Sequence, residues 1–176
     1  MQNALIPVLG FAAYSGAGKT TLLTKLIPLM KKNGLRVALI KHSHHNFEID
    51  KPGKDSYRLR KAGATPVMLV SRHRRAVITE LEHVEDPHLD EQLQYIDQSV
   101  LDLILVEGFK ADRFPKIEIH RPVINKPLLY PNDDSIIAVA SDFPLSVPEK
   151  LELLDLNNPD LIKDYILKQF LKIDHD

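Results

Sequence analysis

The residues best placed to do chemistry lie in one short segment near the N-terminus, Ala13-Tyr14-Ser15-Gly16-Ala17-Gly18-Lys19-Thr20. Gly16 and Gly18 allow tight turns that point backbone N–H groups into one concavity, and a helix beginning at Lys19 adds its positive end. Lys19 is expected to reach the β and γ phosphates of a nucleotide, and the Thr20 hydroxyl to bind Mg²⁺. The segment therefore predicts a phosphate-binding loop, or P-loop, whose nucleotide-binding residues are Ser15, Gly16, Ala17, Gly18, Lys19, Thr20 and Thr21.

The loop departs from the usual G-x-x-x-x-G-K-[ST] pattern at one position, since Ala13 replaces the first glycine. Alanine adds only a methyl group and fits wherever the backbone keeps a negative φ. A Gly-Ala-Gly turn that merely caps a helix is the alternative. The order of strand, loop, Lys19-Thr20 and helix favours phosphate binding.

Glu107 is the acidic residue expected to complete the Mg²⁺ site. It follows the most apolar run of the chain, residues 101–106, so we expect it at the tip of a buried strand next to the P-loop. A carboxylate there binds the metal directly or through water. The alternative is an acid that merely ends a strand.

Asp50 is the third predicted catalytic residue, with Lys19 and Glu107. It lies in a polar loop after the second predicted strand, where it can reach the metal or position the attacking water, and Asp55 is a second candidate. Three further lysines, Lys51, Lys54 and Lys110, either neutralise phosphate charge or are simply solvated. Since no water-positioning glutamine or arginine finger is recognisable, we expect slow hydrolysis, or none without a partner.

The base of the nucleotide is harder to predict. The guanine motif Asn-Lys-x-Asp fails, because Asn125-Lys126-Pro127 is followed by Leu128. Ser141 and Asp142 follow a predicted strand, and a carboxylate there can accept both N–H groups of guanine's Watson–Crick edge. The alternative is that Asp142 opens a turn before Pro144, and both interpretations stay open.

Three histidines, His42, His44 and His45, lie in the same polar loop as Asp50. Together they could bind zinc or nickel, or donate hydrogen bonds to phosphate. One His-rich loop without a second cluster at ligand spacing is a weak indication of a metal site.

The predicted elements alternate between strand and helix. We expect strands at residues 8–12, 36–40, 67–71, 76–79, 101–106, 117–120 and 136–140, and helices at residues 19–32, 55–62, 90–97 and 159–171. Apolar runs such as 36–40 suit strands buried on both faces of a parallel sheet. The pattern predicts an α/β protein with the three-layer P-loop NTPase fold, a mainly parallel sheet flanked by helices, in a single domain over residues 1–176.

The composition is that of an ordinary globular protein, with 176 residues, 44% of them hydrophobic and 27% charged. No apolar run approaches the roughly 20 residues of a membrane helix, and the N-terminus has no secretory pattern. Cysteine is absent, which excludes disulfides and thiolate metal sites and suits a reducing compartment. We therefore expect a soluble cytoplasmic protein with no membrane contact.

Charge is segregated along the chain. Residues 41–75 hold nine basic and three acidic residues, a net charge of +6, whereas residues 76–110 hold nine acids and one lysine, a net charge of −8. The basic zone indicates either an anionic ligand or partner, or a solvated face. The chain as a whole, at a net charge of −1, is too acidic to favour nucleic acid.

Four motifs occur in order: the P-loop, Leu39-Ile40-Lys41-His42-Ser43-His44-His45, Asp50-Lys51-Pro52-Gly53-Lys54-Asp55-Ser56, and Leu105-Val106-Glu107-Gly108-Phe109-Lys110. Together they resemble the molybdopterin-guanine dinucleotide biosynthesis protein B family. The likeness extends from the first strand to Ser141-Asp142, which is most of the chain, and alanine in place of the first glycine is compatible with it.

The resemblance implies a homodimer that binds GTP with Mg²⁺ and has weak GTPase activity. It also implies an auxiliary role: such proteins assist the guanylyltransferase that joins GMP to molybdopterin. The basic zone would then face the transferase or the phosphate of molybdopterin.

Two other classes of function stay open at this stage. In a P-loop small-molecule kinase, Asp50 or Asp55 would activate an acceptor hydroxyl and the basic zone would close over the phosphates. In a metal-delivery NTPase, the three histidines would carry the metal.

Overall fold

The computed structural model describes residues 1–43, 47–81 and 85–173. The chain divides into two compact units. One consists of Met1–His42 and His88–Asp176, and we call it the sheet unit; the other consists of Ser43–Pro87, and we call it the hairpin unit. The division lies within the span that the sequence predicts as a single domain.

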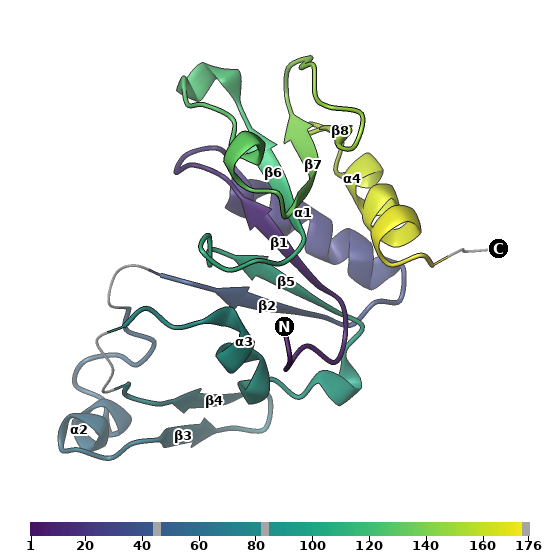
Figure 1. Ribbon diagram of the computed structural model, residues 1–176. Helices are drawn as coiled ribbons and strands as arrows, with labels where there is room; N and C mark the ends of the chain where they lie inside the picture. The colour runs from purple at the N-terminus through teal and green to yellow at the C-terminus, as the bar shows by residue number, and fades with distance from the viewer. Residues whose placement is uncertain (44–46, 82–84, 174–176) are drawn as a thin grey trace. The chain divides into compact units, whose positions relative to one another are not determined.

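The sheet unit contains a six-stranded sheet in the order β2-β5-β1-β6-β7-β8, in which every neighbouring pair is parallel (Figure 1). Its strands are β1 (Val8–Ala12), β2 (Val37–Lys41), β5 (Leu103–Glu107), β6 (Lys116–His120), β7 (Ile136–Ser141) and β8 (Glu152–Asp155). The P-loop strand β1 lies near the middle, between β5 and β6. Parallel strands point their carboxyl ends to one edge, so the residues that follow them meet there.

Both faces of the sheet are covered by helices, which confirms the predicted α/β fold class. Along β1 and β5 the side chains alternate: Phe11 and Leu105 pack into one hydrophobic cluster, and Val8 and Ile104 into another. The first cluster includes residues of α1 (Lys19–Lys32) and α4 (Pro159–Tyr165), and the second includes Leu89 of α3 (Leu89–Gln92). A strand buried on both faces is apolar at every position, as residues 101–106 nearly are.

Short helical turns connect these elements. They are the 3₁₀ turns Leu93–Tyr95, Gln98–Val100, Pro122–Ile124 and Tyr130–Asn132, and a π-helical turn, Ile166–Phe170, that continues α4. Among the described residues, no helix is both long enough and apolar enough to cross a membrane.

Several predicted boundaries differ from the observed ones, including the strands predicted at residues 36–40 and 101–106, which are Val37–Lys41 and Leu103–Glu107. The strand Glu152–Asp155 was not predicted, because only Leu154 of its four residues is buried and the segment lacks a clear apolar alternation. The helix expected over residues 90–97 is confined to Leu89–Gln92 and continues as a 3₁₀ turn. Ser141 is the last residue of β7 and does not follow it.

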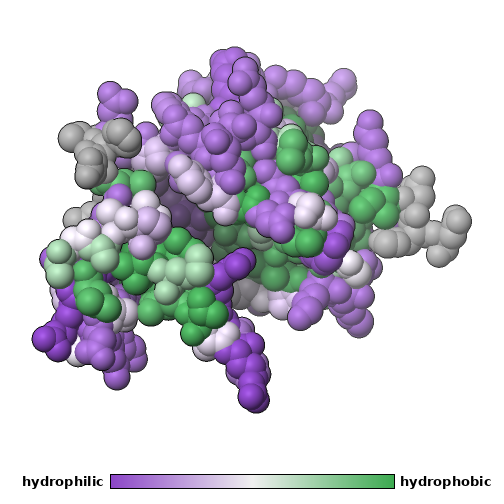
Figure 2. Space-filling model, turned by 90° about the horizontal axis from the view of Figure 1, so that it is seen from below, coloured by the Kyte–Doolittle hydropathy of each residue, from purple (hydrophilic) through white to green (hydrophobic). Residues whose placement is uncertain are grey.

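The hairpin unit consists of α2 (Asp55–Lys61) and an antiparallel pair, β3 (Val67–Val70) and β4 (Arg75–Ile78). Met68 lies opposite Val77 in the ladder, and both side chains are exposed, as is that of Val70. Figure 2 shows hydrophobic residues at the surface of the molecule among hydrophilic ones. Arg60, which is 7% exposed as a whole residue, forms ion pairs through its guanidinium with Glu48 and Glu80.

Candidate functional site

The P-loop connects β1 to α1 and has the backbone that phosphate binding requires. Gly16 and Gly18 have φ values of 82° and 94°, a left-handed conformation that other residues avoid. Ala13 is not among the residues with positive φ, and it is 1% exposed. Alanine therefore fits at this position without strain, and a larger side chain would not.

Backbone N–H groups at the start of α1 are available to an anion. The first hydrogen bond of the helix runs from the Leu22 N–H to the Gly18 carbonyl at 2.9 Å, and no side chain caps the helix. In the described part of the chain, no oxygen accepts a hydrogen bond from the N–H groups of Lys19, Thr20 and Thr21. Such groups, with the helix dipole behind them, favour a phosphate.

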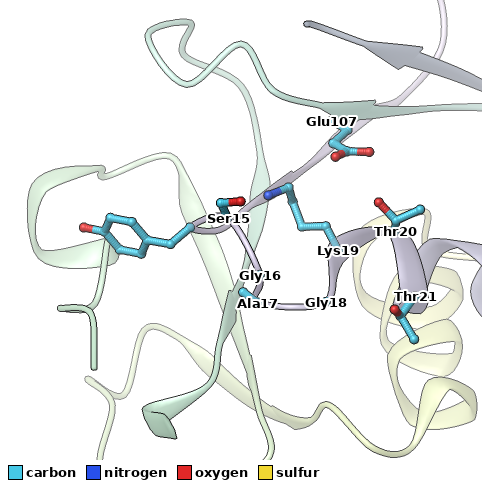
Figure 3. Close-up of a pocket in the computed structure, with 9 residues that line it drawn as sticks. Ser15, Gly16, Ala17, Gly18, Lys19, Thr20, Thr21 and Glu107 are labelled. Atoms are coloured by element: carbon cyan, nitrogen blue, oxygen red, sulfur yellow. The ribbon is translucent and has the colours of Figure 1, made fainter. Parts of the chain in front are cut away.

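These groups surround a cavity of about 320 Å³. It is lined by Tyr14, Ser15, Gly16, Ala17, Gly18, Lys19, Thr20, Thr21 and Glu107. Figure 3 shows the side chains of Lys19, Thr20 and Glu107 directed toward the same space. All the predicted phosphate-loop residues, Ser15 to Thr21, are thus brought together with the predicted metal-binding carboxylate.

Glu107 reaches this position through the register of the sheet. It ends β5 opposite Phe11 of β1 on one side and Lys41 of β2 on the other. The Lys41 ammonium lies 3.4 Å from the Glu107 carboxylate. Gly108 follows with a φ of 99°, and a Cβ there would lie 2.7 Å from Cβ of His42, so glycine is needed for this close packing.

Positive charge is concentrated around the cavity. Burial lowers the pKa of the Lys19 ammonium; Glu107 opposes that shift, and the nearby Lys110 and Lys41 add to it. Lys19 donates a hydrogen bond of 3.2 Å to the Ala13 carbonyl. An anion bound between these cations relieves their mutual repulsion, so the site favours a highly charged ligand.

Thr20 and Glu107 form a set of oxygen donors that fits Mg²⁺. This ion prefers one or two protein oxygens together with phosphate oxygens and water. A hydroxyl and a carboxylate on the same cavity, beside the N–H groups that would hold the phosphates, meet this requirement. The pair would hold the ion only when a nucleotide supplies the remaining ligands.

Asp142 is connected to the P-loop through a residue that sequence reasoning missed. The Arg121 guanidinium forms an ion pair of 2.5 Å with the Asp142 carboxylate and donates from Nε to the Ala17 carbonyl at 3.1 Å. Ser141 is 5% exposed, and its hydroxyl donates to the Phe143 carbonyl at 2.8 Å.

Lys41 and Arg121 share a property that could have identified them. Lys41 ends β2 and Arg121 directly follows β6, so each is a basic residue at the carboxyl end of a parallel strand. In this class of fold, ligands bind at that edge.

The remaining predicted residues belong to the hairpin unit or to segments outside the described residues. Asp50 lies in the hairpin unit and is 8% exposed. One of its oxygens accepts a hydrogen bond of 3.0 Å from the Ser56 hydroxyl; the other, Oδ2, is buried with no partner among the described residues. Asp55, Lys51 and Lys54 are exposed in the same unit.

The histidine loop is only partly described. His44 and His45 lie outside the described residues, and the His42 ring packs against Phe109 with a centroid distance of 4.8 Å. In residues 1–43, 47–81 and 85–173, no group of three or more His, Asp or Glu side chains is arranged to hold a metal ion.

Comparison with known proteins decides the family. The sequence model described as "Molybdopterin guanine dinucleotide synthesis protein B" matches residues 8–142, from the start of β1 to Asp142. This chain belongs to that family. The matched span includes the P-loop, Glu107 and the Arg121–Asp142 pair, and the resemblance inferred from the four motifs is confirmed.

Individual members of the family are similar over almost their whole length. Proteins named molybdopterin-guanine dinucleotide biosynthesis adapter protein are 46% identical to this chain in Haemophilus influenzae, over 94% of this chain and 90% of theirs, and in Escherichia coli, over 97% of both. A crystal structure of molybdopterin-guanine biosynthesis protein B superposes with a TM-score of 0.70 at 25% identity, covering 92% of this chain and 98% of that one. The fold described above is therefore that of the family.

Proposed function

We propose that this chain is an adapter in the biosynthesis of molybdopterin guanine dinucleotide that binds GTP with Mg²⁺ and hydrolyses it slowly. The observation that carries the nucleotide part is that the N–H groups of Lys19, Thr20 and Thr21 have no acceptor among the described residues, and that these residues line one cavity with Glu107. The adapter role follows from the names of the relatives that are 46% identical. We place this role in the cytoplasm, since a chain without cysteine suits a reducing compartment.

In this proposal each residue of the loop has one task. The N–H groups from Ser15 to Thr21 hold the phosphates, Lys19 neutralises the β and γ phosphates, and Thr20 and Glu107 hold Mg²⁺. Bound Mg²⁺ would supply further neutralisation of charge as the γ-phosphoryl group is transferred. Lys41, now paired with Glu107, would become free to approach the phosphates once the carboxylate binds the metal.

Hydrolysis would be slow because the cavity offers little beyond binding. Among the described residues that line it, none is a glutamine or arginine of the kind that accelerates GTP hydrolysis. Asp50 belongs to the hairpin unit, and its role in positioning the attacking water stays a prediction from the sequence. Glu107→Gln and Asp50→Asn should both lower GTP turnover, and only Glu107→Gln should also change the Mg²⁺ dependence of binding.

For the base we retain Ser141 and Asp142 as the proposed contacts. The ion pair with Arg121 uses Oδ2 of Asp142, and a carboxylate has a second oxygen that can accept from guanine. Ser141 can contribute only through its backbone or by giving up the bond to Phe143.

We further propose a homodimer and a protein partner, and assign both to the hairpin unit. Met68, Val70 and Val77 expose an apolar strip that an association would cover. Arg72 and Arg74 lie in the exposed turn of the same hairpin and suit the acidic or phosphorylated surface of the molybdopterin guanylyltransferase or of molybdopterin itself. Sedimentation of Met68→Ser/Val77→Ser should show a shift toward monomer, and an unchanged dimer would contradict this assignment.

The central test is the binding of GTP and ATP, with Mg²⁺ and with a chelator, to the parent chain, Lys19→Ala and Lys25→Ala. Lys25 is exposed on the same helix, so it controls for the loss of one positive charge. GTP should bind the parent and Lys25→Ala alike, and Lys19→Ala about a hundredfold more weakly. Equal affinity for Lys19→Ala would contradict phosphate binding at this loop, and an equal preference for ATP would contradict the guanine assignment.

A further inference from the structure

Arg121 lies outside the cavity, yet it makes the contact that fixes the loop's backbone. Its Nε donates to the Ala17 carbonyl at 3.1 Å, and its terminal nitrogen NH1 forms the 2.5 Å ion pair with Asp142. Arg121 is not part of the lining of the cavity, whereas Ala17 and Gly18 are. The arginine therefore contacts the backbone of the loop without lining the cavity.

The orientation of one peptide group follows from this contact. The only cis peptide bond among the described residues is Thr65–Pro66, so the Ala17–Gly18 peptide is trans, and its carbonyl and N–H point in opposite directions. With the Ala17 carbonyl held by Arg121, the Gly18 N–H points away from the guanidinium. No oxygen among the described residues accepts from that N–H group.

Gly18 has a left-handed φ of 94°, which favours glycine, and a Cβ at this residue would be in ordinary contact with Nε of Arg121 at 3.4 Å. The guanidinium thus packs close against the backbone of the loop. Arginine suits this position because its planar guanidinium can donate to the Ala17 carbonyl and to the Asp142 carboxylate at the same time. The ammonium of a lysine does this less well.

We propose that Arg121 and Asp142 form a positioning pair for the P-loop: Arg121 orients the Ala17–Gly18 peptide toward the phosphates, and Asp142 holds Arg121 in place. This inference deepens the proposed nucleotide binding and rests on it. It gives Asp142 a role in binding any polyphosphate, whether or not a base is attached.

Inorganic tripolyphosphate is the probe that isolates this role, because it carries the charge of a nucleotide without its base. Its dissociation constant, measured by calorimetry with the full-length chain, should rise about tenfold for Arg121→Ala and about threefold for Asp142→Asn. GTP affinity should fall by similar factors. Arg121→Lys should weaken tripolyphosphate binding as much as Arg121→Ala does, since it keeps the positive charge but lacks the planar guanidinium.

Asp142→Asn gives a test in which the two explanations predict opposite signs. It removes a negative charge close to the site, so a purely electrostatic effect would tighten the binding of tripolyphosphate. The positioning role predicts weaker binding. A merely structural role would instead lower the melting temperature of the unliganded protein, which we expect to change little for Asp142→Asn.

The exposed pair Arg113–Asp134 is the matched control. Its nitrogen and oxygen lie 3.6 Å apart, and its residues precede β6 and β7, at the edge of the sheet opposite the P-loop. Arg113→Ala and Asp134→Asn repeat the two charge changes and should leave the affinity for tripolyphosphate within about twofold of the parent.

Several outcomes would overturn the proposal. These are tighter or unchanged tripolyphosphate binding by Asp142→Asn, a loss confined to GTP, or parent-like binding by Arg121→Lys. If the parent itself bound neither GTP nor tripolyphosphate, the proposed nucleotide binding would fail first, and the two failures are thereby distinguishable.

Discussion

The sheet unit and the hairpin unit bury their apolar side chains to different extents. In the sheet unit, helices cover both faces of a sheet whose paired strands are distant in sequence, and residues such as Leu9 and Leu105 are fully buried. In the hairpin unit, two strands of four residues pair locally and leave Met68 and Val70 exposed. The buried interior of the sheet unit suits a loop whose backbone groups must be held rigidly to bind phosphates. The exposed apolar surface of the hairpin unit suits association with another protein.

The largest effect that the comparison predicts comes from added bulk in the sheet unit. A Cβ on Gly10 of β1 would lie 2.6 Å from Cε2 of Phe114, which is itself buried. Gly10→Val should therefore lower the free energy of unfolding by about 3 kcal/mol, measured by urea denaturation. A corresponding change in the hairpin unit, Ala76→Val at a half-exposed strand position, should change the free energy of unfolding little. Equal losses of unfolding free energy would contradict the difference in packing between the two units.

A buried ion pair in the sheet unit should have the next largest effect. The Lys116 ammonium is almost fully buried and donates to the Asp133 carboxylate at 3.0 Å and to the Ser135 hydroxyl at 2.9 Å. Asp133→Asn leaves the ammonium without its counter-charge, so the free energy of unfolding should fall by about 2 kcal/mol at neutral pH.

The pH dependence of that loss gives an independent check. Burial alone would raise the pKa of Asp133, but hydrogen bonds from Ser135 and Lys116 outweigh burial and lower it. A carboxyl with a lowered pKa stabilises the fold above its ordinary pKa, and this contribution disappears as pH falls through the folded-state value. The difference between parent and Asp133→Asn should thus shrink below about pH 4, and a constant difference would contradict the ion pair.

A smaller effect is expected for the buried arginine of the hairpin unit. Arg60 pairs with Glu48 and Glu80, whose side chains are 46% and 53% exposed and so remain solvated when the arginine is removed. Arg60→Met should lower the melting temperature by about 3 °C and speed amide exchange in residues 47–81. GTP affinity should not change. A loss of affinity comparable to that of Lys19→Ala would contradict the assignment of nucleotide binding to the sheet unit.

The smallest effect on stability is expected from reversing charge in the hairpin turn. Arg72, Arg74 and Arg75 are exposed, and their change to Glu should move the melting temperature by no more than about 2 °C. Binding of the guanylyltransferase or molybdopterin should weaken about tenfold in a pull-down or titration, while GTP affinity stays the same. Unchanged partner binding would contradict the proposal that the basic zone is the docking surface.

How much the sequence predicts also differs between the units. The apolar run that precedes Glu107 and the Gly16–Gly18 turn are local patterns, so the P-loop, its strand and the family were all accessible from residue order. Lys41 and Arg121 were not, because lysine and arginine are common and only the register of parallel strands brings Lys41 opposite Glu107. Arg121 meets Ala17 across 104 positions of sequence, a contact that no local pattern encodes.

In the hairpin unit the strands were predictable from the sequence, but the exposure of their side chains was not. Its strands were predicted to within a residue or two at each end, since Val67 to Val70 is a compact apolar run. Which of their side chains would be exposed was not predicted, because that depends on what covers each face of the ladder. Asp50 was proposed from its place after the second strand, and its buried, unpartnered oxygen could not be foreseen from the residue type.

The position of β1 within the sheet has a consequence for how the protein is made. Phe11 is flanked by Glu107 and Ile117, which are synthesised long after it, so the strand that carries the phosphate loop stays unpaired until β5 and β6 have left the ribosome. The ability to bind a polyphosphate should therefore arise late in translation, and a chain that stops before Arg121 should lack it. Ligand capture by a ribosome-bound chain would thus report that most of the larger unit has already folded.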